Sequence, residues 1–345
     1  MLIKRYISFL LGIKIVFIHM VILIILLSST SEALIEVEDF RGRKLTLKKP
    51  VERVVCLIES GLTGIYMLKR HDRIVGVPTN VYDEGYYYKG TFEYYSMLDE
   101  SIRLKKIPAV GNWESVNIEK VLSLKPDLII IWSNQAEVAE KFEKLGVPIY
   151  GVFITKIDDV YKEILDFGRM LDADTRAHEL VEYVKEELRK IIEVSKNIRE
   201  KRKVYFSWAQ IDLLKTSCGE SIVNELINLV GAVNVCSDIK LESVSLNMEE
   251  LVSRNPDVIV MWHSKSLGPS DLFKNNQLRT VNAVKNKSVY QFDDTFSFDL
   301  WTLKFIYALK FMANKIYPEF YHYNLEEEYR KIFSILYGKD LDSKI

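Results

Sequence analysis

The chain has 345 residues, which is enough for two domains of ordinary size. Its composition, 48% hydrophobic and 28% charged, is typical of a globular protein and excludes a disordered or fibrous one. The 47 basic residues nearly cancel the 48 acidic ones, which argues against a nucleic-acid binder, and three scattered cysteines and five histidines argue against a disulfide scaffold or clustered metal ligands.

Residues 1–33 have the pattern of an export signal. Lys4 and Arg5 precede a long apolar stretch from Tyr6 to Leu27, and small polar residues lead to Ala33. The stretch is also long enough to span a bilayer as an uncleaved anchor, whereas the lack of a following cysteine argues against a bacterial lipid anchor. In either case we expect the remaining chain outside the cytoplasm, on the outer face of the cytoplasmic membrane or in a periplasm.

Short apolar segments alternate with amphipathic helical patterns along the rest of the chain. This alternation predicts an α/β architecture with largely parallel sheets. We expect an N-terminal α/β lobe over 34–156, a helical segment over 157–200 and a C-terminal α/β lobe over 201–345. The predicted buried strands are 51–58, 74–77, 128–132, 149–153, 204–208, 258–262 and 288–292.

One helix–strand unit occurs twice, 130 residues apart. The segment VNIEKVLSLKPDLIIIW (116–132) aligns without gaps with LNMEELVSRNPDVIVMW (246–262), and seven of the 17 positions are identical. In each copy Asn caps a helix, Glu follows in the first turn, Pro-Asp ends the helix and Trp closes a buried strand. The duplication predicts two similar lobes.

A long helix is predicted between the two copies. Residues 175–198 carry an apolar stripe at helical spacing, with Asp174 as the expected N-cap. About 24 residues form a rod of roughly 36 Å, which is long for a helix inside one lobe. We therefore expect a stiff strut that joins the lobes and limits their rotation.

With these features the sequence resembles the substrate-binding proteins of ABC importers for iron chelates, haem and cobalamin. The resemblance covers about 36–337 and rests on RGRKLTLKKPVERVVCL, VGNWESVNIEKVLSLKPDLIIIW, GRMLDADTRAHEL, TSCGESIVNELINLVGAVNV and the second repeat, in that order. It implies an α/β fold of two Rossmann-like lobes with largely parallel sheets, joined by one long α-helix, with a ligand cleft between the lobes. It also implies a monomeric, non-catalytic receptor without a resident cofactor, which delivers an iron or cobalt chelate (ferric siderophore, haem or corrinoid) to an ABC permease and ATPase complex.

The resemblance assigns roles to three residues. Glu119 and Glu249, one in each repeat, match glutamates that dock onto permease arginines in this family. Taken singly, each is also an ordinary residue of a first helical turn. Trp113, in the loop before the first repeated helix, matches a family position that contacts ligand.

Three more tryptophans end predicted strands. Trp132 and Trp262 close the repeated strands, and Trp208 closes the strand VYFSW. The carboxyl ends of strands are where open α/β sheets place ligands, so together with Trp113 they predict an aromatic-lined cleft. The alternative for each is that it covers the core.

Four other residues are candidates for the same cleft. Tyr82 begins a stretch with six tyrosines, 82–96, which we expect to be a surface excursion near the cleft mouth. His263 directly follows a strand-closing tryptophan. Phe296 and Phe298 lie in DDTFSFDLW, after the last predicted strand.

Two other functions stay open. A zinc or manganese receptor of related shape needs several His or carboxylate ligands in the cleft, and only His263 is well placed. An exported α/β enzyme is disfavoured, because the chain has no G-x-S-x-G elbow, G-x-G-x-x-G turn or phosphate loop. Cys218 and Cys236 lie in one lobe and either pair in an oxidising compartment or stay buried as thiols.

Overall fold

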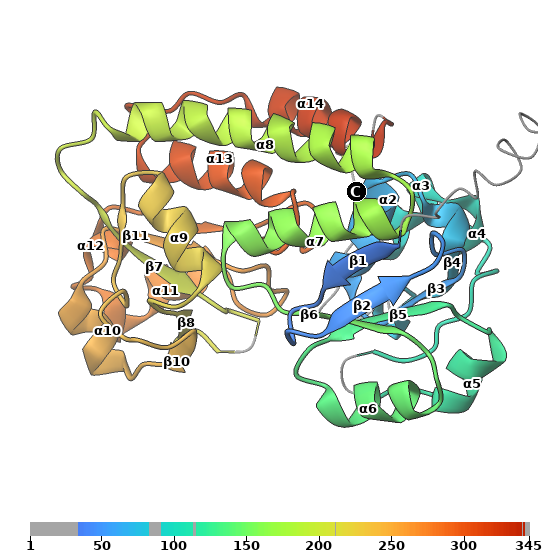
Figure 1. Ribbon diagram of the computed structural model, residues 1–345. Helices are drawn as coiled ribbons and strands as arrows, with labels where there is room; N and C mark the ends of the chain where they lie inside the picture. Colours follow the sequence, from blue (N-terminus) through green and yellow to red (C-terminus); the bar gives the residue numbers. More distant parts are fainter. Residues whose placement is uncertain (1–33, 83–90, 113–114, 211, 340, 342–345) are drawn as a thin grey trace, which may run out of the picture.

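The computed structural model describes residues 34–82, 91–112, 115–210, 212–339 and 341. Within them the chain forms two α/β lobes that lie side by side, with helices running along one side of both (Figure 1). The segment on which the export prediction rests lies outside the described residues. Among the helices that the structure does describe, none combines the length and apolar character needed to cross a membrane.

The first lobe is built on a four-stranded parallel sheet with the order β4–β3–β5–β6. The apolar runs of its strands are buried on both faces because helices cover both sides of the sheet. An antiparallel hairpin of β1 (Ile35–Glu38) and β2 (Lys44–Leu47), which the sequence pattern did not predict, precedes it. The other strands and helices are β3 (Val54–Cys56), α2 (Glu59–Met67), β4 (Ile74–Gly76), α3 (Thr91–Leu98), α4 (Glu100–Arg103), α5 (Ile118–Ser123), β5 (Leu128–Trp132), α6 (Ala136–Lys144) and β6 (Ile149–Val152).

The second lobe contains a six-stranded mixed sheet. Its order is β10–β8–β7–β11–β12, with β9 also pairing with β7. β7, β9, β11 and β12 are parallel, whereas β8 and β10 add an antiparallel edge. The elements are β7 (Lys203–Ser207), β8 (Lys215–Ser217), α9 (Ile222–Leu229), β9 (Val233–Asn234), β10 (Ser243–Ser245), α10 (Met248–Arg254), β11 (Val258–Met261), α11 (Pro269–Lys274), α12 (Asn282–Lys285) and β12 (Val289–Gln291).

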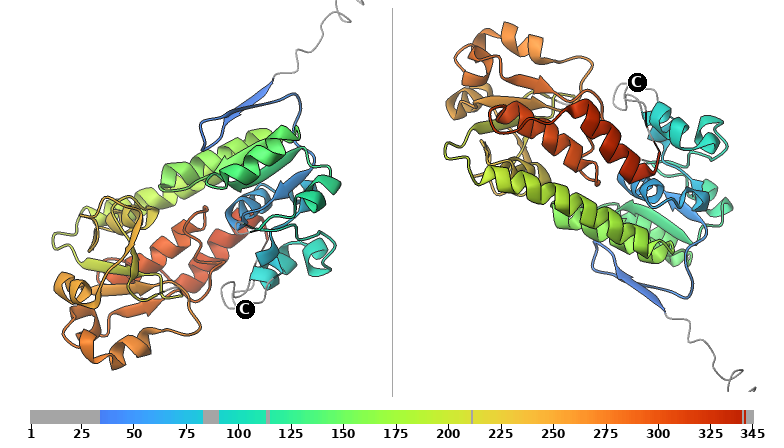
Figure 2. Two further views of the ribbon diagram at one scale, coloured as in Figure 1. Left: turned by 90° about the horizontal axis from the view of Figure 1, so that it is seen from below. Right: turned by 90° about the horizontal axis from the view of Figure 1, so that it is seen from above.

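Four helices connect the lobes: α7 (Ile157–Met170), α8 (Asp174–Ser195), α13 (Phe305–Ile316) and α14 (Leu325–Tyr337). Figures 1 and 2 show α8 running along both lobes beside α13 and α14. With 22 residues α8 is about 33 Å long, as expected of the strut. The predicted N-cap was wrong by one residue, since Ala173 takes this position and Asp174 lies in the first turn.

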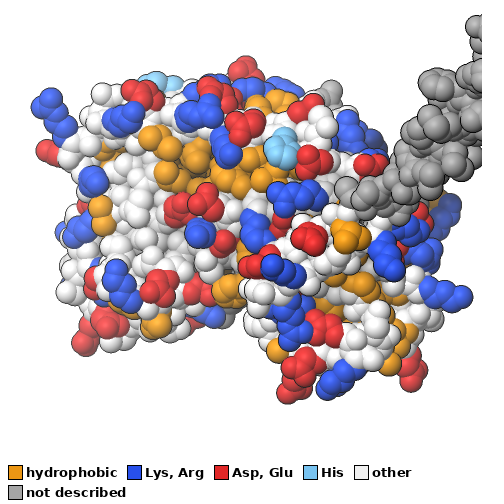
Figure 3. Space-filling model, viewed as in Figure 1, with side chains coloured by type: hydrophobic (Ala, Val, Ile, Leu, Met, Phe, Trp, Pro, Cys, Tyr) orange, Lys and Arg blue, Asp and Glu red, His pale blue; other side chains and the backbone are white. Residues whose placement is uncertain are grey.

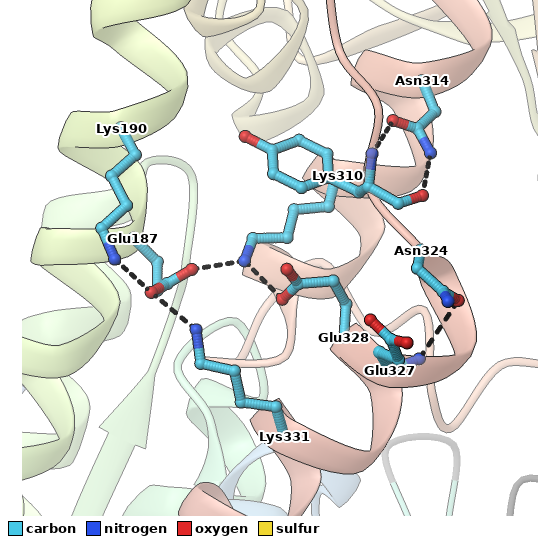
Figure 4. Close-up of polar contacts among 9 residues, drawn as sticks. Glu187, Lys190, Lys310, Asn314, Asn324, Glu327, Glu328 and Lys331 are labelled. Atoms are coloured by element: carbon cyan, nitrogen blue, oxygen red, sulfur yellow. Dashed lines mark hydrogen bonds and ion pairs between the residues drawn. The ribbon is translucent and has the colours of Figure 1, made fainter.

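A buried ion network holds α8 against α13 and α14 (Figure 4). Glu187 of α8 is 4% exposed and accepts hydrogen bonds from Lys310 of α13 and, at 3.1 Å, from Lys331 of α14. Lys310, 1% exposed, also donates to Glu328 of α14 at 2.6 Å. Because these charges are paired in a desolvated place, they link three helices at one point along the strut.

The two copies of the repeat fold alike. They form α5–β5 and α10–β11, and Asn117 and Asn247 cap their helices through the side chain, as predicted. After each helix the carboxylate of the Pro-Asp pair accepts from the backbone N–H at the start of a neighbouring strand: Asp127 from Arg53 at 2.9 Å, and Asp257 from Lys203 at 2.9 Å. The Pro-Asp pair therefore positions the central strands of both sheets.

Candidate functional site

A cavity of about 690 Å³ lies between the lobes, where strands of both sheets end. Its walls come mainly from the segments after β3, β5 and β6 of the first lobe and after β7, β11 and β12 of the second, with Asn80 after β4 and Glu242 before β10. Carboxyl ends of strands are where open α/β sheets bind ligands. Figure 3 shows the surface hollowed between the lobes on the side away from α8. The lining residues are Leu57, Ile58, Glu59, Ser60, Asn80, Trp132, Asn134, Gln135, Phe153, Trp208, Gln210, Glu242, Trp262, Thr295, Asp299 and Trp301.

Three of the predicted tryptophans line this cavity. Trp132 is the last residue of β5, whereas Trp208 and Trp262 directly follow β7 and β11. The repeat thus places one tryptophan from each lobe at the same opening. Trp113, the fourth, lies outside the described residues.

Trp301 is a lining residue that the sequence reasoning missed. Its ring stacks on Trp208 with centroids 5.7 Å apart and 16° between the planes, and it packs edge-on against Trp262 at 5.7 Å. Trp208 and Trp262 are 5.2 Å apart, so the second lobe presents a packed group of three indoles. Aromatic groups of this kind offer a large apolar surface at little cost in conformational entropy.

Three carboxylates also line the cavity and were not predicted: Glu59, Asp299 and the exposed Glu242, which directly precedes β10. Glu59 begins α2 directly after β3, and Asp299 lies in the loop after β12. Glu59 accepts from Asn80 Nδ2 at 3.0 Å and from Thr91 Oγ1 at 3.4 Å. Burial raises the pKa of Glu59 to about 7, against the opposing effect of nearby Lys304. The rule that strand ends carry the site identifies Glu59 from sequence, since it follows a predicted strand.

The segment DDTFSFDLW reaches the cavity, but through other residues than expected. Phe296 and Phe298 are 0% and 2% exposed and pack in the core, so neither lines the cavity, and Thr295, Asp299 and Trp301 do. Apolar aromatic side chains gain more from complete burial than from lining a wet opening.

The tyrosine-rich stretch was wrongly expected to be a surface excursion over its second part. Tyr94 and Tyr95 lie in α3 and are 2% and 0% exposed, because Tyr94 stacks on Phe296 at 4.3 Å and Tyr95 hydrogen-bonds Thr63 at 2.7 Å. Tyr82 is half-buried, donates to the carbonyl of Ile107 at 2.7 Å and does not line the cavity. Residues 83–90 lie outside the described part.

The histidine candidate sits behind the wall. His263 is 7% exposed, with Nδ1 3.3 Å from the carbonyl oxygen of Phe292, and does not line the cavity. Among the described residues, no group of three or more His, Cys, Asp or Glu is placed to hold a metal ion. Cys218 and Cys236 are buried free thiols in this structure.

The two repeated glutamates lie at equivalent places. Glu119 is in the first turn of α5 and Glu249 in the first turn of α10, and both side chains are exposed. Neither lines the cavity. Their role in docking stays a prediction.

Comparisons with known proteins agree with this architecture. A family model described as periplasmic binding protein matches residues 54–295. The uncharacterized ABC transporter substrate-binding lipoprotein YvrC of Bacillus subtilis is 28% identical over 296 residues, or 83% of this chain and 86% of that protein. The vitamin B12-binding protein of Yersinia pestis is 26% identical over 217 residues, or 62% of this chain and 71% of that protein. The molybdate periplasmic binding protein MolA of Haemophilus influenzae has the same fold, with a TM-score of 0.76 at 17% identity over 89% of this chain and 99% of that chain.

Proposed function

The chain belongs to the periplasmic binding protein family and is a substrate-binding protein of the ABC-transporter type, and we propose that it captures a metal chelate between its lobes. The chelate is a ferric siderophore, haem or a corrinoid. The protein acts outside the cytoplasm and delivers the chelate, without chemical change, to the membrane-bound complex of permease and ATPase.

The tryptophan-lined cavity is the observation that carries this proposal. Trp132 of one lobe and the Trp208, Trp262 and Trp301 group of the other border the same space of about 690 Å³. Ligand pockets typically measure roughly 300 to 1,000 Å³, so this one suits a chelate better than a bare ion. The rings are matched to the broad apolar faces of a chelate, and the amides of Asn134 and Gln135 to its polar groups.

Delivery is proposed to use the outer ends of the lobes. Glu119 and Glu249 are exposed at equivalent first turns, which supports their predicted contact with permease arginines. The strut α8, held by its buried ion network, favours small changes in lobe orientation over a wide hinge motion.

The test is a titration of the purified protein followed by tryptophan fluorescence. The panel contains ferric siderophores, haem, cobalamin, cobinamide and free zinc and manganese ions, with corrections for absorption by the coloured ligands. We expect saturable 1:1 quenching by one class of chelate, because four of the five tryptophans line the cavity. A response to a free metal ion alone, with silence across the chelates, contradicts the proposal and favours the metal-ion receptor.

A further inference from the structure

The cavity wall carries acids and no base among its described residues. Glu59, Glu242 and Asp299 are lining residues, whereas no described lining residue is Lys, Arg or His. The other polar lining groups are amides and hydroxyls. On the face drawn in Figure 3 the two signs of charge are interspersed, so the one-sided charge of the cavity is a local feature.

One buried ammonium group lies behind this wall. Lys304 is fully buried, and its Nζ is 3.5 Å from Asp299 Oδ2 and 3.8 Å from the centre of the Phe296 ring. Lys304 lies close enough to Glu59 to oppose the rise in the pKa of Glu59, but Lys304 does not line the cavity. Asp299, Glu59 and the buried Asp294 all lie near this one amine, so the carboxylates outnumber the positive charge and leave an excess of negative charge when they are ionised.

The tryptophans, like the carboxylates, favour a positively charged ligand. The faces of indole rings attract cations, and three such rings lie together at Trp208, Trp262 and Trp301. The Nε1 of Trp208 already donates to Ser217 Oγ at 3.0 Å, so this residue offers the ligand its ring rather than its N–H group. This feature is independent of the carboxylates.

From these two features we infer that the cavity selects chelates that present a cationic or N–H-rich face and discriminates against chelates that present carboxylates. The inference rests on the proposed function, because it concerns the ligand of the same cavity. An anionic group placed near Glu59 and Asp299 is repelled in a partly desolvated space, whereas an ammonium or amide N–H group supplies Glu59 with the solvation that burial removes.

Two probe series vary the ligand charge on a constant skeleton. The first is an iron(III) trihydroxamate whose terminal amine is free, acetylated or succinylated, which makes it cationic, neutral or anionic. The second is a cobalt corrinoid with all side-chain amides intact or with one hydrolysed to a carboxylate. Isothermal titration calorimetry of the purified protein gives the affinities, with an anionic ferric tricatecholate as a further probe.

In the series that binds, we expect the cationic or amide form to bind about tenfold or more tightly than the carboxylate form. Equal or tighter binding of the carboxylate form, or preference for the tricatecholate, overturns the inference and leaves the proposed function standing. Absence of binding by every chelate overturns both the inference and the proposed function, so the failure of the inference alone can be distinguished from the failure of both.

The Glu59→Gln variant tests whether the carboxylate of Glu59 causes the selectivity. The substitution keeps the shape and an acceptor for Asn80, and we expect it to reduce the preference for the uncharged or cationic form about fivefold. Glu140→Gln, an exposed position on α6 outside the cavity, is the matched control and leaves the preference unchanged. Unchanged selectivity in folded Glu59→Gln overturns the assignment to this carboxylate.

The unmodified protein supplies a second measurement that does not depend on a variant folding. Raising the salt concentration from about 50 to about 500 mM screens charges, so the ratio of the affinities for the amide and carboxylate forms should decrease. A preference that is independent of salt overturns its electrostatic origin.

Discussion

Glu59 is placed in the cavity by its position directly after β3, at the start of α2. The same position removes part of its solvent, and burial raises the pKa of this carboxyl to about 7. Asn80 and Thr91 supply two hydrogen bonds but do not restore full hydration. Ionised Glu59 therefore lowers the stability of the ligand-free protein. Carboxyl groups with a pKa perturbed in this way are typical of functional sites.

This cost predicts a pH dependence of stability. The folded protein binds the Glu59 proton more tightly than the unfolded chain, so this group lowers stability as pH rises from about 4.5 to about 7, and the loss persists above that range. At pH 8, Glu59→Gln should therefore raise the free energy of unfolding by about 1 to 3 kcal/mol, and at pH 4 by much less. Urea unfolding at both values measures the difference.

Glu249→Gln, the same substitution on an exposed first turn, is the control for this experiment. A Glu59→Gln effect of equal size at pH 4 and pH 8 contradicts the assignment of the cost to ionisation.

At the scale of elements, α8 depends on more than its own apolar stripe. Ala177, Leu180, Val184 and Ile191 are buried against the lobes, which gives the helix its affinity for both. Glu187 lies on this buried side, where an unpaired carboxylate would be costly. Lys190, Lys310 and Lys331 supply the pairing, and two of these three come from α13 and α14.

Removing Glu187 should weaken this junction. Although burial opposes its ionisation, hydrogen bonds from Lys190 and Lys310 lower the pKa of Glu187 to about 2. Its contribution is present above about pH 4.5 and is lost as pH falls towards 2. Glu187→Gln should therefore reduce the free energy of unfolding by about 3 kcal/mol at pH 7, measured by denaturant titration with circular dichroism.

The neighbouring Glu186 is a matched control, since it pairs with Arg189 on the exposed face of the same helix. Glu186→Gln should change stability by less than about 1 kcal/mol. Equal effects of the two substitutions argue that the buried network does not hold the strut.

At the scale of the whole molecule, one hydrophobic core runs from the first lobe through the connecting helices into the second. It includes Val54 and Ile130 of one sheet and Val204 and Val260 of the other. The two lobes are therefore coupled by packing as well as by the chain. We therefore expect the proposed ligand to alter the relative orientation of the lobes only slightly, and we propose that a permease registers this change through Glu119 and Glu249.

This arrangement predicts that docking needs both glutamates. Exposed Glu–Arg pairs are individually weak, so Glu119→Gln or Glu249→Gln alone should reduce chelate uptake by cells about two- to fivefold and the double variant at least about tenfold. Ligand affinity of the purified double variant should be unchanged, because neither residue lines the cavity.

Glu140→Gln, an exposed position on α6, serves as the control for uptake. If the double variant loses ligand affinity together with uptake, the two glutamates belong to the binding site and the docking role is wrong.

Much of the fold was readable from local patterns. The α/β alternation, the duplicated unit and the long helix are confirmed, because each depends on periodicity and capping within a few residues. The hairpin of β1 and β2 was missed although IEVE and KLTL both alternate apolar and polar residues, because each strand has only four residues and gives a weak signal. The repeats also share a backbone feature that the residue types do not reveal. Lys125 and Asn255, at equivalent positions, both have a left-handed backbone, with φ of 48° and 45°.

The cavity shows where sequence reasoning ends. By itself the sequence determined that Trp132, Trp208 and Trp262 stand where strands end, because strand boundaries are local and parallel strands share one ligand-binding edge. Only the tertiary structure decided that Trp301 and Asp299 line the cavity while Phe296 fills the core. These three residues lie in one irregular loop, in which no period assigns a side chain to a face. Which of them faces the cavity follows from packing against residues about 200 positions away, such as Tyr94.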